Sequence, residues 1–104
     1  MKSIDVLSSR IGALGITQQK AAELCGMSRQ RMWDIMKKRN PKFRSVSMIA
    51  DGLGLQIRIS GMDGREIGFD QMKFLASCEE QNVLYDSLVE ILEKAGIRME
   101  LVPW

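Results

Sequence analysis

The segment Gln18–Met36, QQKAAELCGMSRQRMWDIM, decides the fold of this chain. It reads as two short helices, Thr17 to Cys25 and Ser28 to about Lys38, separated by Gly26. Glycine is favoured where a helix ends in left-handed backbone, and threonine and serine are favoured as the residues that cap a new helix. The pattern therefore predicts two helices that meet across a tight turn.

The apolar positions of this segment fit a close crossing of the two helices. Helices joined by a short turn approach each other steeply, and Ala22 lies where they come nearest, so a larger side chain there would force them apart. The other positions that must face inward are also apolar. They are Ala21, Cys25, Met27, Met32 and Ile35.

The segment is similar to the lambda-repressor/Cro-like (XRE-type) helix-turn-helix family of DNA-binding domains, over about residues 3–55. The resemblance implies an N-terminal domain of four helices. It also implies that the helix from Ser28 enters the major groove and that the helix from Thr17 lies across the phosphate backbone. The matching sites are Thr17-Gln18, Gly26-Met27-Ser28, Arg39-Asn40-Pro41, Ile49-Ala50 and Leu53-Gly54.

The outward face of the second helix carries side chains suited to DNA bases. With its apolar residues inward, Arg29, Gln30 and Trp33 project outward and Arg31 flanks them. Arginine pairs with guanine and glutamine with adenine, each pair worth about 1–3 kcal/mol of discrimination. We expect all four to read bases. The alternatives are phosphate contact only for Arg29 and Gln30, and packing on a neighbouring helix or a partner protein for Trp33.

Charge is distributed unevenly along the chain. Residues 1–44 contain ten basic and three acidic side chains, a balance of +7, whereas residues 45–104 contain five basic and ten acidic ones, a balance of −5. The first part attracts a polyanion and the second repels it. Helix starts and the basic segment are therefore expected to contact phosphates. The expected residues are Thr17, Gln18, Gln19, Ser28, Lys37, Lys38, Arg39, Lys42 and Arg44.

The flanking segments predict a mainly α fold with a small β element. Residues 3–14, capped by Ser3, and residues 43–53 have apolar side chains at helical spacing, whereas residues 55–60 alternate as a strand does. Residues 61–64 read as a hairpin turn, with Ile67 and Phe69 on a return strand. Asp70 to Ala95 reads as one long helix, followed by a last strand from Ile97.

Two parts are expected: a helix-turn-helix domain at residues 1–54 and an α+β segment (hairpin, helix, strand) at residues 55–104 for dimerisation or partner binding. A chain of 104 residues gains stability by pairing, so we expect a homodimer. In some lambda-repressor-like antitoxins a strand after the fourth helix pairs with its copy. This resemblance implies Leu55, Ile57 and Ile59 as dimer contacts, with the long helix packed either on that shared sheet or on its own hairpin.

The composition argues against several classes of protein. The chain has no histidine, the commonest general acid and base near neutral pH, so we expect no enzymatic activity. Cys25 and Cys78 are too few for a structural zinc site, and we expect both to be buried in a reducing cytoplasm. No uncharged run is long enough to cross a bilayer. No metal, cofactor or membrane contact is expected.

These patterns together favour a sequence-specific DNA-binding transcriptional regulator, expected to be a dimeric repressor of an inverted-repeat operator on double-stranded DNA. An alternative is an antitoxin that represses its own operon and binds its toxin through the C-terminal half. A third possibility is a protein–protein adaptor that has kept the fold and lost DNA binding.

Overall fold

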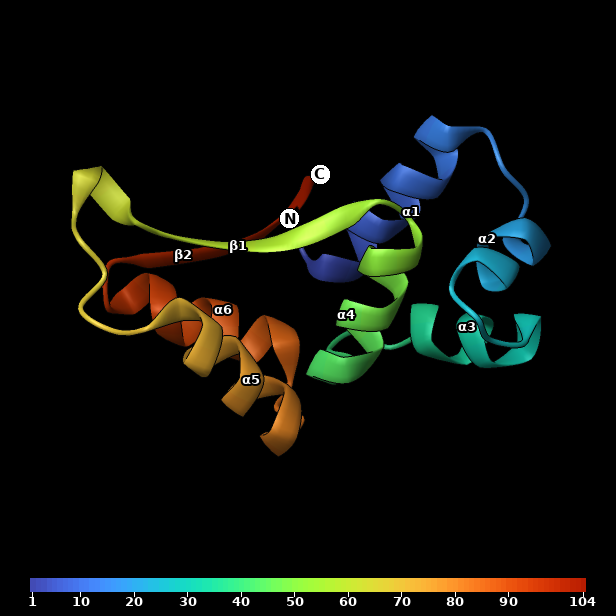
Figure 1. Ribbon diagram of the computed structural model, residues 1–104. Helices are drawn as coiled ribbons and strands as arrows, with labels where there is room; N and C mark the ends of the chain where they lie inside the picture. Colours follow the sequence, from blue (N-terminus) through green and yellow to red (C-terminus); the bar gives the residue numbers. More distant parts are fainter.

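The computed structural model describes all residues, 1–104, and consists of six α-helices and one two-stranded antiparallel sheet (Figure 1). This agrees with the predicted mainly α fold with a small β element. The elements, in chain order, are α1 (Ser3–Leu14), α2 (Gln18–Leu24), α3 (Arg29–Met36), α4 (Phe43–Gly52), β1 (Leu55–Gly61), a 3-10 turn (Met62–Gly64), α5 (Gln71–Gln81), α6 (Tyr85–Lys94) and β2 (Ile97–Pro103).

Helices α2 and α3 form where the capping residues predict them. The Thr17 hydroxyl accepts a hydrogen bond from the backbone N–H of Lys20 at 3.1 Å, and the Ser28 hydroxyl accepts one from that of Arg31 at 3.1 Å. Between the two helices Gly26 has φ +67°, a left-handed conformation that glycine adopts without steric cost. The predicted pair of short helices across a tight turn is confirmed.

Helix α4 lies between the other N-terminal helices and the C-terminal half of the chain (Figure 1), and it contributes to two clusters of buried side chains. Its Ile49 and Ala50 pack with α1, α2 and α3, whereas its Phe43 and Val46 pack with α5, α6 and the sheet. The boundary predicted after residue 54 therefore does not separate two independently packed parts, because α4 contributes to both cores. The first cluster is Leu7, Ala21, Ala22, Cys25, Met32, Ile35, Ile49, Ala50, Leu53 and Leu55.

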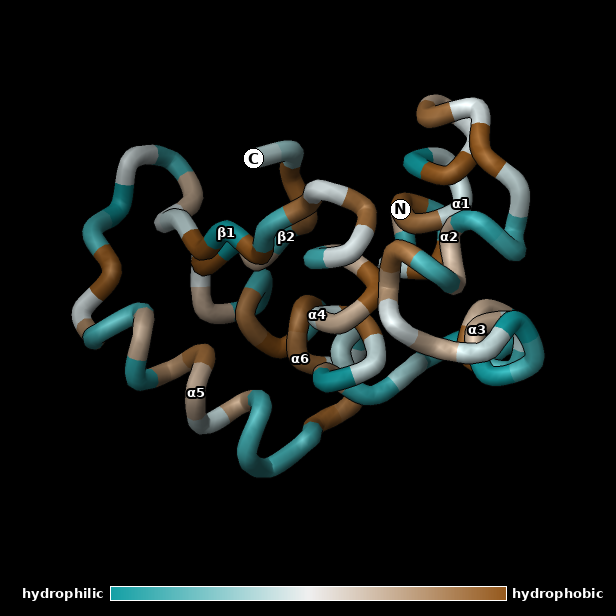
Figure 2. The backbone as a smooth tube through the Cα atoms, turned by 45° about the vertical axis from the view of Figure 1, so that its right-hand side comes forward, coloured by the Kyte–Doolittle hydropathy of each residue, from teal (hydrophilic) through white to brown (hydrophobic).

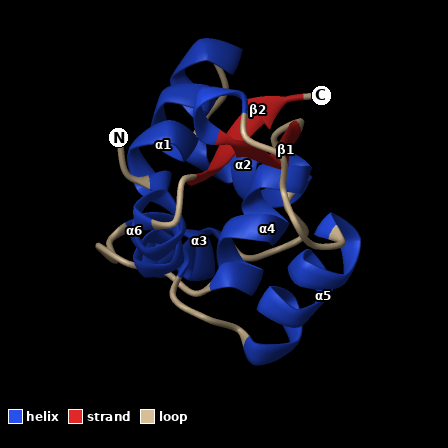
Figure 3. Cartoon of the chain, turned by 90° about the vertical axis from the view of Figure 1, so that its left-hand side faces the viewer, coloured by secondary structure: helices blue, strands red, loops and turns tan.

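The predicted return strand at Ile67 and Phe69 is wrong. Strand β1 pairs instead with β2, with Ile57 opposite Leu101, and α4, α5 and α6 lie on one face of this sheet (Figure 3). The segment with Ile67 offers only two apolar positions around a glycine, whereas β2 supplies a full register of seven residues. Long-range pairing with the better apolar strand therefore prevails over a local hairpin.

The predicted single helix from Asp70 to Ala95 is also wrong, because the chain breaks between α5 and α6. Asn82 adopts the left-handed conformation, φ 49°, and residues 83–84 pair with the segment before α4. Specifically, Phe43 N–H donates to the Val83 carbonyl at 2.7 Å. The break turns α6 back, so that Cys78 of α5 and Tyr85 of α6 enter the same core.

The predicted capping role of Ser3 needs a smaller correction. Ser3 is the first residue inside α1, and Lys2 precedes it in extended conformation without capping through its side chain. Ser3 is buried, and both its backbone N–H and its hydroxyl donate to the Asp86 carboxylate of α6. The cap of α1 therefore comes from a residue 83 positions away in the sequence.

Candidate nucleic-acid interface

Helix α3 has one buried face and one exposed face. Met32 and Ile35 are 2% and 5% exposed and belong to the first core, whereas Arg29, Gln30 and Arg31 lie on the surface. Trp33 is 46% exposed, an unusual position for a large aromatic side chain. The residues expected to read bases therefore lie on the surface of α3, and none of them is buried in the subunit. The hydropathy colouring of Figure 2 shows the polar character of this helix.

The beginning of α2 lies beside the exposed face of α3. Gln18, Arg29, Gln30 and Trp33 line one shared shallow hollow. Gln18, Arg29 and Trp33 also border a second pocket of about 310 Å³, which Ser8 and Ile11 of α1 help to line. Four predicted contact residues, one from α2 and three from α3, are thus brought to one surface. The participation of α1 in this surface was not predicted.

Asp34 organises the exposed side chains of α3. The Gln30 side-chain Nε2 donates to Asp34 Oδ1 at 3.0 Å, which leaves the Gln30 carbonyl oxygen free. Lys37 Nζ lies 4.0 Å from the same carboxylate oxygen and 5.7 Å from the ring centroid of Trp33. The network uses one acidic side chain to hold a glutamine and a lysine in place. Asp34 is not among the predicted site residues, although its spacing of four from Gln30 and three from Lys37 is the signal for such pairs.

The other residues predicted to contact phosphates differ in whether their side chains are free to bind an anion. Lys38, Arg39, Lys42, Gln18 and Gln19 are exposed, and none of the three basic ones forms an ion pair. The hydroxyls of Thr17 and Ser28 already accept the capping hydrogen bonds of α2 and α3. These two hydroxyls can still donate to an anion, because a hydroxyl has one donor besides its acceptor capacity.

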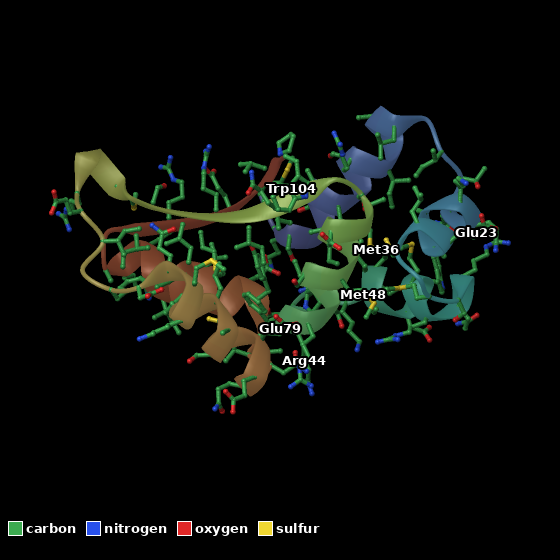
Figure 4. The ribbon with its side chains drawn as sticks, viewed as in Figure 1. Glu23, Met36, Arg44, Met48, Glu79 and Trp104 are labelled. Carbon is green, nitrogen blue, oxygen red and sulfur yellow. The ribbon has the colours of Figure 1, made fainter.

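Arg44, a predicted phosphate contact, lies beside the C-terminal end of α5 (Figure 4). Its Nε donates to the carbonyl of Glu79 at 2.8 Å, and its terminal nitrogen donates to the carbonyl of Glu80 at 3.1 Å. The guanidinium thus donates to two carbonyls at the C-terminal end of α5, one of which also accepts from the Asn82 N–H, and complements the negative end of that helix. Arg44 is exposed, so its phosphate contact stays a prediction that has to compete with these hydrogen bonds within the chain.

Two of the three predicted dimer contacts have buried side chains. Leu55 and Ile59 are each 4% exposed, so a partner strand could pair only with their backbone. Ile57 is half-buried and borders an open groove of about 410 Å³ between α4, β1 and α5. Strand β1 has no neighbouring strand on its second edge.

The same groove contains apolar residues that sequence analysis missed. Met72 and Trp104 both line it and are 77% and 76% exposed. Figure 4 labels Trp104, above α4. Helix α5, which forms one wall of the groove, has Cys78 as its one buried residue. The one sequence signal for it is the presence of large apolar side chains among polar neighbours in residues 70–73 and at the C-terminal end.

The two cysteines are free and buried, as predicted. Burial, with a smaller effect of the Asp51 carboxylate, raises the pKa of the Cys25 thiol to about 11. No three His, Cys, Asp or Glu side chains are grouped in a way that would hold a metal ion. None of the helices combines the length and apolar character that a membrane span requires.

Comparisons with protein-family models, curated proteins and solved structures gave no match. The assignment of a function to this chain therefore depends on the geometry and chemistry of its own residues.

Proposed function

We propose that this protein is a sequence-specific DNA-binding transcriptional regulator, a dimeric repressor whose first four helices act as a lambda-repressor-like helix-turn-helix domain. In this proposal α3 enters the major groove and α2 lies across the backbone. One observation carries the proposal: α3 presents Arg29, Gln30 and Trp33 to solvent while Met32 and Ile35 anchor its other face in the core.

The chemistry of the exposed residues suits a duplex. The guanidinium of Arg29 can donate two hydrogen bonds to guanine, and the free carbonyl oxygen of Gln30 can accept one from an adenine or cytosine amino group. Trp33 offers an apolar surface to a thymine methyl group. Gln18 at the start of α2 and the exposed Lys38 and Arg39 after α3 are available to phosphates.

The charge distribution supports the same orientation. The +7 balance belongs to residues 1–44, which include α1, α2 and α3, and the −5 balance belongs to the remainder. A polyanion approaching the molecule is attracted to the α3 surface and repelled by the acidic half. Binding should therefore weaken steeply with salt, with log K falling by about 0.9 per neutralised phosphate for each tenfold rise in salt.

Dimerisation through the edge of β1 completes the proposal. The second edge of β1 is unpaired and lies beside the apolar groove of Ile57, Met72 and Trp104. Antiparallel pairing of two such edges would place the two α3 helices symmetrically, as an inverted-repeat operator requires. The expected half-site separation is about one helical turn, near 34 Å.

Selection of random DNA duplexes on the purified protein tests this function. We expect an enriched inverted repeat with half-site centres about ten base pairs apart. The double variant Arg29→Ala/Gln30→Ala should lose the enriched sequence. A matched control is Gln71→Ala/Lys73→Ala, which removes a glutamine and a basic residue at exposed positions of α5. This control should still enrich the same sequence. Failure to enrich any sequence, or unchanged selection by the α3 variant, contradicts the proposal and favours an adaptor.

A second candidate function is an antitoxin, and the apolar groove between α4, β1 and α5 is the observation that favours it. A groove of about 410 Å³ with Met72 and Trp104 exposed is large enough to seat side chains of a toxin. Purification from the native host followed by mass measurement separates the two candidates. A second small protein in stoichiometric amount favours the antitoxin, whereas a complex of two identical chains favours the homodimer.

A further inference from the structure

The second pocket beside α3, with a volume of about 310 Å³, lies between α1, α2 and α3; we call it the α1–α3 pocket. Half of its lining residues are apolar, namely Ile11, Met32, Trp33 and Met36. The other half have polar or charged side chains, namely Ser8, Gln18, Arg29 and Lys37. Small-molecule sites are concave, largely apolar and about 300–1,000 Å³ in volume, with a few polar groups. The pocket therefore has the form of a site for a small ligand.

The charged side chains that line the pocket are all positive. They are Arg29 and Lys37, and no acidic residue lines it, although residues 1–44 contain three. Asp34 reduces the effect of Lys37, because its Oδ1 lies 4.0 Å from Lys37 Nζ and also accepts a hydrogen bond from Gln30. Arg29 forms no ion pair. The pocket therefore keeps an unbalanced guanidinium, which favours an anion.

The apolar wall of the pocket favours an anion that carries a hydrocarbon group. Met32 is buried, and Ile11 and Met36 are half-buried. An inorganic phosphate, or a phosphate of DNA, has no apolar surface to remove from water there, whereas a hydrocarbon group gains free energy by such burial. Thioether side chains also adapt their shape to a small apolar group.

The α1–α3 pocket shares residues with the surface proposed to read bases. Gln18, Arg29 and Trp33 line both this pocket and the shallow hollow that includes Gln30. A guanidinium that donates two hydrogen bonds to a carboxylate cannot donate the same two to a guanine. A ligand in the pocket and a DNA duplex therefore compete for Arg29.

We propose that the α1–α3 pocket binds a small organic carboxylate and that this ligand displaces DNA. The carboxylate pairs with Arg29, and the hydrocarbon part rests against Ile11, Met32 and Met36. Binding of the carboxylate depends on the pocket alone, whereas the displacement of DNA rests on the regulator function proposed above. In that function the carboxylate is an inducer, because it releases the repressor from its operator.

Methyl NMR of the full-length protein with ¹³C-labelled methionines tests the binding without DNA. Three probes separate charge from apolar surface: phenylacetate has both, phenylacetamide has the same shape without charge, and acetate lacks the ring. Phenylacetate should give saturable shifts of Met32 and Met36 and leave Met72, which lines the groove beside α5, unchanged. At matched ionic strength phenylacetamide should bind about tenfold more weakly, since it forms no charge-assisted hydrogen bond. Acetate should bind more weakly than phenylacetate, because it buries little apolar surface.

Two variants of α1 test the position of the ligand. Ser8→Leu fills the pocket and should abolish the shifts caused by phenylacetate. Ser9→Leu places the same side chain at an exposed position of α1 outside the pocket and should bind as the unchanged protein does. Circular dichroism checks that both variants fold. Equal binding of phenylacetate and phenylacetamide, unmoved Met32 and Met36 signals, or equal affinities of the two variants would overturn the proposed site.

Fluorescence anisotropy of a bound duplex tests the displacement of DNA. Phenylacetate at ten times its dissociation constant should lower the apparent DNA affinity about tenfold in the unchanged protein and in Ser9→Leu. It should have no effect on Ser8→Leu, which keeps Arg29 and every other predicted DNA contact, and acetate at the same concentration provides the salt control. Binding of phenylacetate without displacement would contradict the competition for Arg29. A protein that binds no duplex would contradict the regulator function and leave the NMR result for the pocket intact.

Discussion

Ser3 at the start of α1 is held by Asp86 near the start of α6. The Ser3 backbone N–H donates to Asp86 Oδ1 at 2.8 Å, and its hydroxyl donates to Oδ2 at 2.7 Å. One carboxylate thus caps α1 and ties the first helix to the C-terminal half. Carboxylates favour helix N-terminal ends because the backbone N–H groups there carry partial positive charge.

Asp86→Ala should lower the free energy of unfolding by about 2 kcal/mol, because it removes both hydrogen bonds and leaves the buried Ser3 hydroxyl unsatisfied. Asp86→Asn should lose less stability, since its amide can still accept from the Ser3 N–H and donate to the Ser3 hydroxyl. Urea denaturation monitored by circular dichroism measures both. Glu90→Ala, on the exposed side of the same helix, should be neutral. A neutral Asp86→Ala would show that the two bonds do not stabilise the fold.

Ala22→Leu should destabilise the protein by about 1–3 kcal/mol, the usual cost of overpacking a filled core. Ala22 is completely buried between the first helices, so added methyl groups have no free space and push α2 from its neighbours. Thermal unfolding of this variant and of Glu23→Leu, the same new side chain on the exposed face, provides the comparison. Equal melting temperatures for the two would contradict the tight crossing at Ala22.

Arg44→Ala should cost about 1 kcal/mol of stability through loss of its hydrogen bonds to the Glu79 and Glu80 carbonyls. Arg44→Lys should restore little of this stability, because an ammonium lacks the planar guanidinium whose two nitrogens reach both carbonyl oxygens. In salt titrations of DNA binding Arg44→Ala should leave the slope unchanged. Arg39→Ala should instead reduce the slope by about 0.9. A reduced slope for Arg44→Ala would support the predicted phosphate contact and contradict a purely structural role.

Stability should fall as the pH rises from 9 to 11. The Cys25 thiol has its ordinary pKa of 9.0 when unfolded and a pKa of about 11 when buried in the fold. Between these values the unfolded state binds fewer protons, so alkali favours unfolding. Urea denaturation at several pH values should show a shallower decline for Cys25→Ala than for the unchanged protein. Parallel declines would mean that the thiol does not contribute to the alkaline loss of stability.

Asp34→Ala should raise DNA affinity and reduce sequence discrimination at one base pair by about 1 kcal/mol. The affinity rises because a negative charge leaves the α3 surface, and discrimination falls because the Gln30 amide loses the partner that orients it. Binding to the selected duplex and its single-base variants measures both effects. Glu23→Ala removes the same charge from exposed α2 and should raise affinity without changing discrimination. Unaltered discrimination in Asp34→Ala would contradict the positioning role.

Local patterns in the sequence determined the first half of the fold. Thr17, Gly26 and Ser28 act through hydrogen bonds and backbone conformations that involve residues no more than five positions away. Helical spacing likewise identified Met32 and Ile35 as inward, which leaves Arg29 and Gln30 on the surface of α3. Such features are predictable because their causes are local.

Only the tertiary structure decided which distant segments meet. Strand β1 takes β2 as its partner, the chain turns at Asn82, Arg44 reaches α5, and Asp86 caps α1. Each outcome depends on how well segments separated by about 40 to 80 residues pack and satisfy each other's polar groups. A pattern within ten residues carries no information about which distant segments pair. That pairing depends on how much apolar surface each alternative buries in the folded chain.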